Sequence, residues 1–354
     1  MRVLITGGAG FVGSNLALYF KGEHPSATVV AFDNLRRRGA ELNLALFKKN
    51  DIEFVHGDIR IREDLEQLVG NFDLFIEASA EPSVLAGING SPWYVLQTNL
   101  TGTLNCLEFA RLHAPNLIFL STSRVYSVRP LKGITLEETP SRFEIADFQQ
   151  MPGVTTKGIT EDFPVNQPRS LYGTTKLASE LLIQEYVELY GLRAVINRCG
   201  VLSGPGQFGK VDQGVFTLWV SSHFFKRPLK YTGFGGTGKQ VRDLLHPVDL
   251  YSLLKQQIEC LGNWSGEVFN VGGGRKVSTS LRELTSVCEE VVGNAVTIEE
   301  ALDTSSVDIP LYVSDHSKVS GAFDWQPRRS VREIVESIFY WLKANEKELK
   351  TIFS

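Results

Sequence analysis

The chain has 354 residues, of which 43% are hydrophobic, and its formal net charge at pH 7 is −4. A chain of this length can bury a large core, and we expect one large domain with a smaller appended one. The slightly acidic composition shows no polybasic character, which argues against nucleic acid as a partner.

Localisation and metal content are also constrained by composition. No apolar run approaches the length of about 18 residues that a membrane span needs, and no secretory signal precedes the first predicted strand, so we expect a soluble cytoplasmic protein. The four cysteines form no Cys-x-x-Cys pair and are expected to be small buried residues in a reducing compartment: Cys106, Cys199, Cys260 and Cys288. The six histidines show no ligand spacing, so no catalytic metal is predicted.

The first predicted unit is a strand, a glycine turn and a helix. An apolar run at residues 3–5 leads into the sequence TGGAGFVGS and then into a helix-like segment. A second apolar run at residues 28–32 ends in Asp33, twenty residues after Gly13. This spacing is typical of a dinucleotide-binding βαβ unit.

Each glycine of this turn has an expected role. Gly7 would permit the tight turn, Gly10 would let the backbone approach a pyrophosphate, and Gly13 would allow close packing of helix on strand. The helix would direct its positive dipole end and the free N–H groups of its first turn at the phosphates. Phe11 and Val12 belong to that first turn and to the predicted cofactor site.

Asp33 and the adjacent Asn34 mark the expected adenosine end of the site. The Asp33 carboxylate would accept hydrogen bonds from ribose hydroxyls and repel a 2'-phosphate, which favours NAD over NADP. Arg36, Arg37 and Arg38 argue in the opposite direction, because a basic cluster after the second strand could hold that phosphate. We favour NAD.

Helix and strand patterns alternate beyond this unit. Helices are predicted at residues 40–49, 95–112, 172–189, 281–292 and 331–344, and strands at 52–55, 72–77, 117–121 and 194–197. The alternation predicts an α/β fold, a Rossmann doubly wound parallel sheet with ligands at the carboxyl ends of its strands. We expect this NAD-binding domain at residues 1–199, with 240–270 returning to it, and a smaller C-terminal α/β substrate-binding domain at 200–239 and 271–354.

Further cofactor contacts are expected where strands end. Asp58 follows the third strand with Ile59, and its acid could meet the adenine amino group or, equally, cap the next helix. Small residues after the fourth strand would let a ribose or the nicotinamide lie against the backbone; they are Ala78, Ser79 and Ala80. Asn99, in the first part of the following helix, completes this predicted set.

Tyr172 and Lys176 stand at a helix start, and their spacing puts both side chains on one helical face. A free tyrosine has a pKa of about 10, too high for a base at neutral pH. A lysine ammonium one turn away and a positive nicotinamide ring would favour the phenolate, so Tyr172 is a candidate general base and later general acid. The isolated pattern is usually structural, but here it follows five strands of a chain that begins with a dinucleotide turn.

The fifth strand runs into the sequence LSTSRVY at residues 120–126. Together with the Gly-x-x-Gly-x-x-Gly turn and the Tyr-x-x-x-Lys pair, this block resembles the extended short-chain dehydrogenase/reductase family of nucleotide-sugar epimerases and dehydratases, nearly end to end. The resemblance implies that Thr122 hydrogen-bonds the reacting hydroxyl, with Ser123 as the second candidate, and that Lys176 supports both Tyr172 and the nicotinamide ribose. Capping of the strand end is the structural alternative for the two hydroxyls.

The resemblance also implies an NAD that stays bound and is regenerated at each turnover, and a homodimer formed through the helices at residues 95–112 and 172–189. Sugar 4,6-dehydratases typically carry Thr-Asp-Glu after the fifth strand, whereas this chain has Thr122, Ser123 and Arg124. Nucleotide-sugar decarboxylases often have an acid at the position of Arg124. Both activities are therefore disfavoured.

Two later blocks, at residues 211–219 and 238–246, resemble those of family members that epimerise carbon 2 of a CDP-linked sugar. Arg242 is the expected pyrophosphate clamp, because a guanidinium fork matches phosphate oxygens. A charged surface turn is the alternative. A second arginine is usual near residues 305–311, but Asp308 stands there, which leaves the diphosphate contacts open. The remaining expected substrate contacts are Ser123, Arg124, Gln213, Lys239 and Gln240.

The resulting hypothesis is NAD-dependent epimerisation of a CDP- or UDP-linked sugar, by transient oxidation to a keto sugar and return of the hydride to its other face. Epimerisation at carbon 4 of a UDP-sugar, a sugar dehydratase or reductase, a simple alcohol or steroid dehydrogenase, and a non-catalytic NAD(H)-binding regulator remain alternatives. The presence of Thr122, Tyr172 and Lys176 argues against the regulator, which would not need proton-transfer groups.

Overall fold

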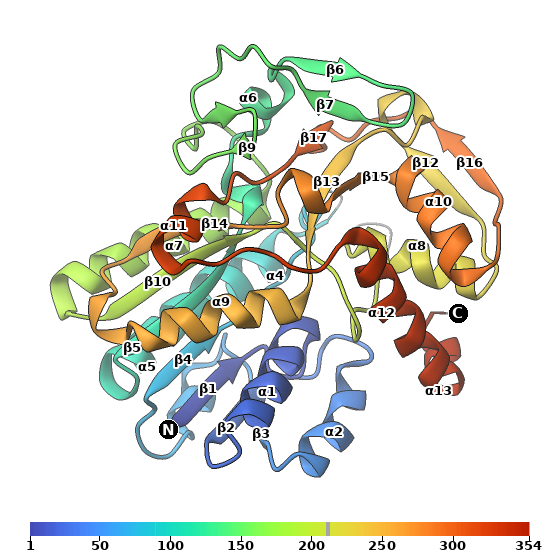
Figure 1. The fold of residues 1–354 in the computed structure, drawn as a ribbon. Coiled ribbons are helices and arrows are strands. Elements are labelled where there is room, and N and C mark those ends of the chain that lie inside the picture. The colour runs from blue at the N-terminus through green and yellow to red at the C-terminus, as the bar shows by residue number, and fades with distance from the viewer. Residues whose placement is uncertain (89, 210–212, 354) are drawn as a thin grey trace. The chain divides into compact units, whose positions relative to one another are not determined.

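The computed structural model describes residues 1–88, 90–209 and 213–353, and the chain divides into two compact units (Figure 1). Unit 1 consists of Met1–Val125, Ser170–Arg198 and Leu250–Phe269, and unit 2 consists of Tyr126–Arg169, Cys199–Asp249 and Asn270–Ser354. The units differ from the expected domains. Residues 126–169 and 240–249, which we expected in the NAD-binding domain, belong to unit 2.

Unit 1 is built on a seven-stranded sheet of order β14-β10-β5-β4-β1-β2-β3. The strands are β1 (Arg2–Thr6), β2 (Thr28–Asp33), β3 (Glu53–His56), β4 (Leu74–Glu77), β5 (Asn116–Thr122), β10 (Arg193–Cys199) and β14 (Glu267–Val271). Neighbouring strands from β3 to β5 run parallel. The strand order reverses between β1 and β4, where doubly wound sheets bind ligands, and the predicted Rossmann fold is confirmed.

Helices pack on this sheet: α1 (Phe11–Glu23), α2 (Asn43–Lys49), α3 (Arg62–Glu66), α4 (Trp93–Leu96), α5 (Gly102–His113), α7 (Leu171–Tyr190) and α9 (Pro247–Glu259). Leu4 and Phe119 of the sheet share one buried cluster with Leu107 of α5 and Ile183 of α7. One expected helix is interrupted. Between α4 and α5 the chain forms a π-helical turn at Gln97–Thr101, a feature that frequently marks functional sites.

Unit 2 is organised around β13 (Val241–Leu245), which pairs with β11 (Val201–Leu202), β15 (Ser278–Ser280) and β17 (Leu311–Tyr312). Helices α8 (Val215–Phe224), α10 (Leu281–Val292) and α12 (Val331–Ala344) form a second buried core that includes Trp219, Leu284 and Ile338. Helices α10 and α12 have the predicted bounds, and each begins with a Ser–Glu capping box. The smaller elements are β12 (Leu229–Thr232), β16 (Ile298–Ala301), α11 (Ser317–Phe323) and α13 (Glu346–Ile352).

Residues 126–169 contain regular structure for which the sequence predicted no element. The segment contains α6 (Val128–Lys132) and two antiparallel hairpins, β6 (Leu136–Glu138) with β7 (Phe143–Ile145) and β8 (Val154–Thr155) with β9 (Gly158–Ile159). The backbone N–H of Ile159 donates to the Val313 carbonyl oxygen at 2.8 Å.

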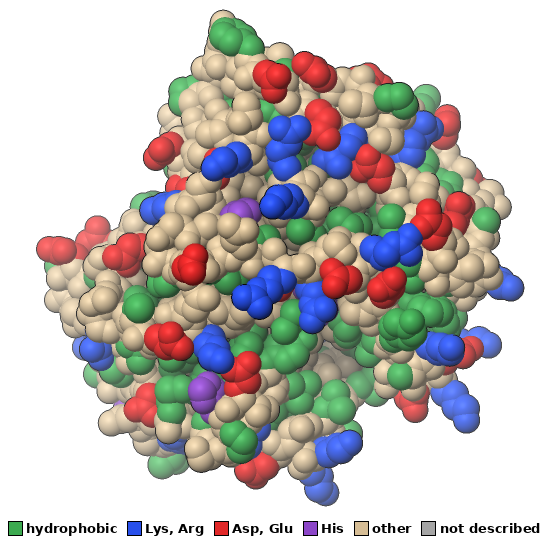
Figure 2. All heavy atoms as spheres, in the orientation of Figure 1, with side chains coloured by type: hydrophobic (Ala, Val, Ile, Leu, Met, Phe, Trp, Pro, Cys, Tyr) green, Lys and Arg blue, Asp and Glu red, His purple; other side chains and the backbone are tan. Residues whose placement is uncertain are grey.

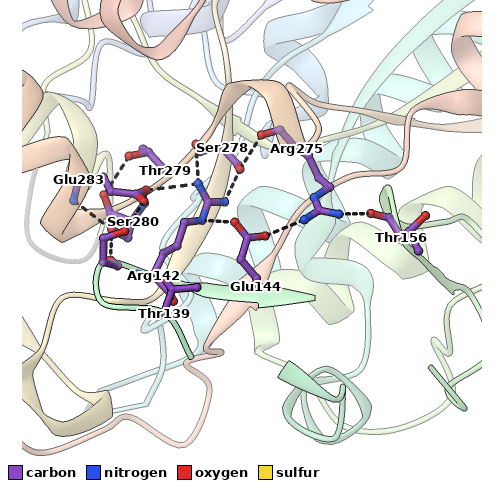
Figure 3. A network of polar contacts seen from close by, with 10 residues as sticks. Thr139, Arg142, Glu144, Thr156, Arg275, Ser278, Thr279, Ser280 and Glu283 are labelled. Atoms are coloured by element: carbon purple, nitrogen blue, oxygen red, sulfur yellow. Dashed lines mark hydrogen bonds and ion pairs between the residues drawn. The ribbon is translucent and has the colours of Figure 1, made fainter. Parts of the chain in front are cut away.

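Two arginines connect these hairpins to the rest of unit 2 (Figure 3). Arg142 lies between Glu144 and Glu283, with ion-pair distances of 2.7 and 3.3 Å, and its Nη2 donates to the Ser278 hydroxyl at 2.6 Å. Arg275 pairs with Glu144 at 3.1 Å and also donates to the Thr156 carbonyl oxygen. These long-range contacts, together with the packing of Ile145 against Val241, Leu311 and Val313, join the segment to unit 2.

The surface charges and three of the four cysteines agree with what the composition led us to expect. Basic and acidic side chains are interspersed over the face drawn in Figure 2. Cys106, Cys199 and Cys288 are buried as expected, but Cys260 is exposed because it lies just beyond the end of α9. Within the described part of the chain, no helix combines the length and the apolar character needed to cross a membrane.

Candidate functional site

The glycine turn joins β1 to α1 and packs tightly on all sides. Gly7 has a φ of +64°, and a Cβ atom there would lie 2.8 Å from the Ala78 carbonyl oxygen. A Cβ atom at Gly13 would lie 2.2 Å from the Gly7 carbonyl oxygen, and one at Gly8 would lie 2.7 Å from the Ala31 Cα. Side chains at these three positions would therefore collide with backbone; the sequence did not single out Gly8.

Gly10 is different from the other glycines of the turn. A Cβ atom there would meet only the Gly7 carbonyl oxygen, at 3.1 Å, so the protein leaves space beside it. Gly10 is also the N-cap of α1, and as a glycine it has no side chain with which to cap this helix. The first-turn N–H groups, which include those of Phe11 and Val12, therefore meet the requirements of a phosphate site.

Asp33 ends β2 beside the turn. Its Oδ2 accepts a hydrogen bond from the Ala9 N–H at 3.2 Å, and its Oδ1 accepts one from the Leu35 N–H at 2.8 Å. Burial raises the pKa of this carboxyl group, although both N–H groups act in the opposite direction. Backbone hydrogen bonds thus fix the orientation of the carboxylate at the end of the strand.

Asp58 follows β3 and binds neighbouring side chains. It pairs with the Arg60 guanidinium at 2.6 Å and accepts a hydrogen bond from Asn34 Nδ2 at 2.8 Å. Burial raises the pKa of Asp58, but the hydrogen bonds from Arg60 and Asn34 outweigh it and lower the pKa to about 2. The capping alternative is wrong, because the N-cap of α3 is Ile61.

The ring of Tyr94 in α4 attracts two arginines of this region. The guanidinium carbon of Arg36 lies 4.1 Å from the ring centroid, and that of Arg60 lies 5.1 Å from it. Arg36, the first arginine of the cluster that could hold the 2'-phosphate of NADP, is therefore in cation–π contact with Tyr94. Ile59 is buried, and its carbonyl oxygen accepts a hydrogen bond from Asn105 Nδ2 at 2.8 Å.

The loop after β4 lies against the glycine turn and is held by Asn99. Its half-buried residues are Ala78, Ser79 and Ala80, and the first two contact the space beside Gly7. Asn99 accepts a hydrogen bond from the Glu81 N–H at 2.7 Å and donates to the Glu81 carbonyl oxygen at 3.0 Å and to Thr175 Oγ1 at 3.2 Å. The Asn99 amide therefore ties this loop to α7; contact with a cofactor stays a prediction.

Tyr172 and Lys176 lie one turn apart at the start of α7, as the spacing predicted. Ser170 caps this helix by accepting a hydrogen bond from the Gly173 N–H at 3.1 Å. The two side chains are only 9% and 1% exposed, respectively. The Lys176 Nζ lies 3.8 Å from the ring centroid of Phe119 in β5, so α7 and β5 meet at the lysine.

Thr122 is the last residue of β5, and α7 packs against the turn that follows it. The Thr122 hydroxyl oxygen accepts a hydrogen bond from the Arg124 N–H at 3.2 Å, which leaves the hydroxyl hydrogen to be donated. Ser123 and Arg124 form a 3₁₀ turn with Val125, and Ser123 is buried. Unit 1 thus holds the three predicted catalytic residues on two elements that pack together.

A buried ion pair that the sequence did not indicate lies one turn further along α7. Glu180 binds Nε and Nη2 of Arg198 at 2.7–3.1 Å and accepts a hydrogen bond from the Ser121 hydroxyl. This pair connects α7 to the ends of β5 and β10. The one signal in the sequence was the spacing of Glu180, which follows Lys176 by four residues and therefore lies on the same helical face.

Arg242 and the other expected substrate residues after position 200 belong to unit 2. Arg242 stands on β13, pairs with Asp308 at 3.0 Å and donates to the Ile309 carbonyl oxygen at 2.8 Å. Asp308, which stands where a second arginine is usual, thus binds Arg242.

The side chains of Lys239, Gln240 and Gln213 have different surroundings in unit 2. Lys239 pairs with Glu138 at 2.8 Å, and Gln240 donates to the Thr232 carbonyl oxygen at 2.9 Å. The Oε1 atoms of Gln240 and Gln213 are buried without a hydrogen-bond partner among the described residues. Residues 211 and 212 of the distinctive block lie outside the described residues.

Residues 3–272 match the model of the NAD dependent epimerase/dehydratase family. The chain belongs to this family. One family member is the CDP-paratose 2-epimerase of Salmonella typhi, which is 32% identical over 352 residues that cover 96% of this chain and 99% of that protein. The UDP-glucuronate 4-epimerase of Thermodesulfobacterium geofontis is 26% identical and covers 99% of this chain, with 98% of its own length matched.

Solved structures of the family agree. The dTDP-glucose 4,6-dehydratase of Streptomyces venezuelae, a double mutant solved with NAD, has a TM-score of 0.80 at 25% identity and covers 99% of this chain and 100% of that one. The UDP-glucuronic acid 4-epimerase of Bacillus cereus has a TM-score of 0.79 at 24% identity, with 97% and 99% covered, and supports the fold. The prediction of an NAD-dependent enzyme of the nucleotide-sugar epimerase and dehydratase family is confirmed.

Proposed function

We propose that this protein epimerises a nucleoside-diphosphate sugar, and that its substrate is a CDP-linked sugar like that of CDP-paratose 2-epimerase. The observation that supports it best is that α7, which carries Tyr172 and Lys176 in its first turns, packs against β5, which ends at Thr122. The relative that is 32% identical over nearly its whole length is a CDP-paratose 2-epimerase, which supports this substrate class.

The fit of unit 1 to a dinucleotide supports the proposal. The open space beside Gly10 and the first-turn N–H groups of α1 suit a pyrophosphate, and the fixed carboxylate of Asp33 suits the adenosine ribose. Asn34 and Asp58 are the proposed contacts at the adenine. When bound, NAD supplies a reversible hydride acceptor next to the sugar.

The chain's own residues would move and hold the proton. Tyr172 as phenolate removes a proton from the sugar hydroxyl while that carbon is oxidised, and it returns the proton after the keto sugar has presented its other face. Thr122 donates its hydroxyl hydrogen to orient the reacting oxygen. The Lys176 ammonium, one turn away, stabilises the phenolate electrostatically.

Arg242 is the proposed diphosphate contact, with Lys239, Gln240 and Gln213 assisting. A phosphate would have to replace Asp308, whose side chain is 31% exposed, as the partner of this guanidinium. Ser123 and Arg124 stand where dehydratases typically carry Asp and Glu, which makes elimination of water the weaker candidate. Epimerisation at carbon 4 of a UDP-sugar uses the same residues and is the main alternative.

The proposal is tested by proton NMR of the purified protein in D₂O with a panel of CDP- and UDP-linked hexoses. We expect inversion at carbon 2 of a CDP-sugar with no deuterium at the inverted carbon, because the hydride returns directly. Inversion at carbon 4 would replace the substrate assignment. Products of water elimination, or no turnover by protein that retains NAD, would refute epimerisation.

Replacement of Tyr172 tests the mechanism. Tyr172→Phe removes the proton-transfer group but keeps the ring, so we expect turnover to fall by about 10²- to 10⁴-fold while NAD is retained. Tyr340→Phe on α12, whose side chain is 63% exposed, is the matched control and should keep full activity. Unchanged turnover in Tyr172→Phe would remove Tyr172 from the mechanism.

A homodimer formed through α5 and α7 is part of the proposal. Large apolar side chains are exposed on both helices, among them Leu104, Leu112, Leu181 and Leu189. Cytoplasmic localisation stays a prediction.

A further inference from the structure

Glu77 is a buried acid at the carboxyl end of β4, with 1% of its surface exposed. Strand pairing places it between Thr6 of β1 and Phe119 of β5. The Thr103 hydroxyl of α5 lies 3.4 Å from Oε2 but also donates to the Asn99 carbonyl oxygen at 2.9 Å, and Oε1 has no hydrogen-bond partner within the described part of the chain. Because a carboxylate with so few donors is costly to bury, its charge needs a compensating cation.

Lys176 is a buried cation whose charge acts on this carboxylate. The Lys176 Nζ lies over the ring of Phe119, the strand neighbour of Glu77, and the lysine is itself 1% exposed. Burial raises the pKa of Glu77, and the positive charge of Lys176 lowers it. Two opposite charges buried near one another cost less free energy than either charge buried alone.

One further titratable group faces the pair. Cys106 of α5 is fully buried; burial raises the pKa of its thiol, the Glu77 charge raises it further, and the Lys176 charge opposes this rise. The thiol therefore stays neutral in the range in which enzymes of this kind act. The neighbours Thr6, Thr103 and Phe119 carry no charge. Glu180, one turn beyond Lys176 on α7, is paired with Arg198 at 2.7 Å.

We propose that Glu77 is a positioning residue for the reaction: its carboxylate is the counter-charge that keeps the Lys176 ammonium in place one turn from Tyr172. It thereby sets the pH range in which Tyr172 exchanges a proton with the sugar. This inference rests on the proposed function.

The proposal predicts a direction. Removal of a negative charge makes proton loss easier for every neighbouring group. In Glu77→Gln, Lys176 and Tyr172 should therefore both lose their protons at lower pH. Both limbs of the pH profile of kcat/KM should shift to lower pH, by about one pH unit. A merely structural role would lower activity or stability at every pH without moving the midpoints.

The experiment compares Glu77→Gln, which keeps the shape of the side chain, with Glu53→Gln, which removes one acid from the exposed β3 position. The pH profile of epimerisation is measured for each variant with the substrate found by NMR. Ultraviolet titration of the Tyr172 phenol, with Tyr172→Phe as the blank, gives a readout that does not need turnover. We expect lower midpoints in Glu77→Gln and wild-type midpoints in Glu53→Gln.

Glu77→Asp separates charge from shape, because it keeps the carboxylate and shortens the side chain. We expect its midpoints to stay close to those of the wild type. Wild-type midpoints in Glu77→Gln, or an equal shift in Glu77→Asp, would overturn the proposal. If the wild type turns over no nucleotide sugar, the proposed function fails, whereas the phenol titration still tests Glu77.

Discussion

Gly10 and Gly13 stand in the same turn but have different structural reasons to be glycine. At Gly13 the position of a Cβ atom is occupied by the protein itself, 2.2 Å from the Gly7 carbonyl oxygen. At Gly10 the nearest atom is 3.1 Å away and the remaining space is open. One residue is therefore needed for folding, and the other leaves room for a ligand.

This difference predicts opposite effects of alanine. Gly13→Ala should lower the free energy of unfolding by about 3 kcal/mol, because backbone must move to relieve the collision. Gly10→Ala should lower it by less than about 1 kcal/mol, since only the helix cap changes, yet weaken NAD binding at least about tenfold. Urea unfolding of NAD-free protein and calorimetric titration with NAD measure the two quantities. Wild-type NAD affinity in Gly10→Ala would place the pyrophosphate elsewhere.

At the scale of elements, a polar network supplements the apolar cluster in which Ile145 of the hairpins packs with Val241, Leu311 and Val313. Arg142 connects β7, through Glu144, with the capping box of α10, through Glu283. Its side chain is 15% exposed, so its charge is largely removed from water. Loss of this cation would leave two partly buried carboxylates without their shared partner.

Arg142→Met should therefore lower the free energy of unfolding by about 2 kcal/mol. Arg332→Met on α12 is the control, because Arg332 also pairs with two acids but is 50% exposed, and its loss should cost no more than about 0.5 kcal/mol. Urea unfolding measures both, and limited proteolysis reports whether the hairpins detach. Equal effects of the two substitutions would show that the network does not fasten the hairpins.

At the scale of the whole molecule, the exposed apolar side chains of α5 and α7 form the interface of the proposed homodimer. Leu181 is 58% exposed on α7, and Leu104 is 41% exposed on α5, the helix that packs beside it. In a two-fold dimer the same patch serves both copies, so one substitution places two like charges in the interface.

Leu181→Glu should convert a dimer into a monomer. Val69→Glu is the control, because Val69 is 82% exposed on a loop outside both helices and should leave the dimer intact. Size-exclusion chromatography with light scattering gives the mass of each variant. A monomeric wild type, or a dimeric Leu181→Glu, would contradict the proposed interface.

The sequence by itself determined the features that depend on local spacing. Three features could be predicted from spacing alone: the turn from Gly7 to Gly13, the acid at Asp33 and the Tyr172–Lys176 pair. Backbone conformation and helical periodicity place the residues of such features at fixed intervals in the sequence. For the same reason the bounds of α10 and α12 were predicted correctly: each helix starts at its own capping serine.

Only the tertiary structure decided which charged side chains meet. Glu180 and Arg198, and Arg242 and Asp308, are each separated in sequence by an interval that no periodicity connects. The position of the hairpins of residues 126–169 was not predicted, because the arginine contacts that hold them join residues far apart in the chain. Such pairs form because a buried charge must find an opposite charge or a donor, and the fold alone determines which of them is within reach.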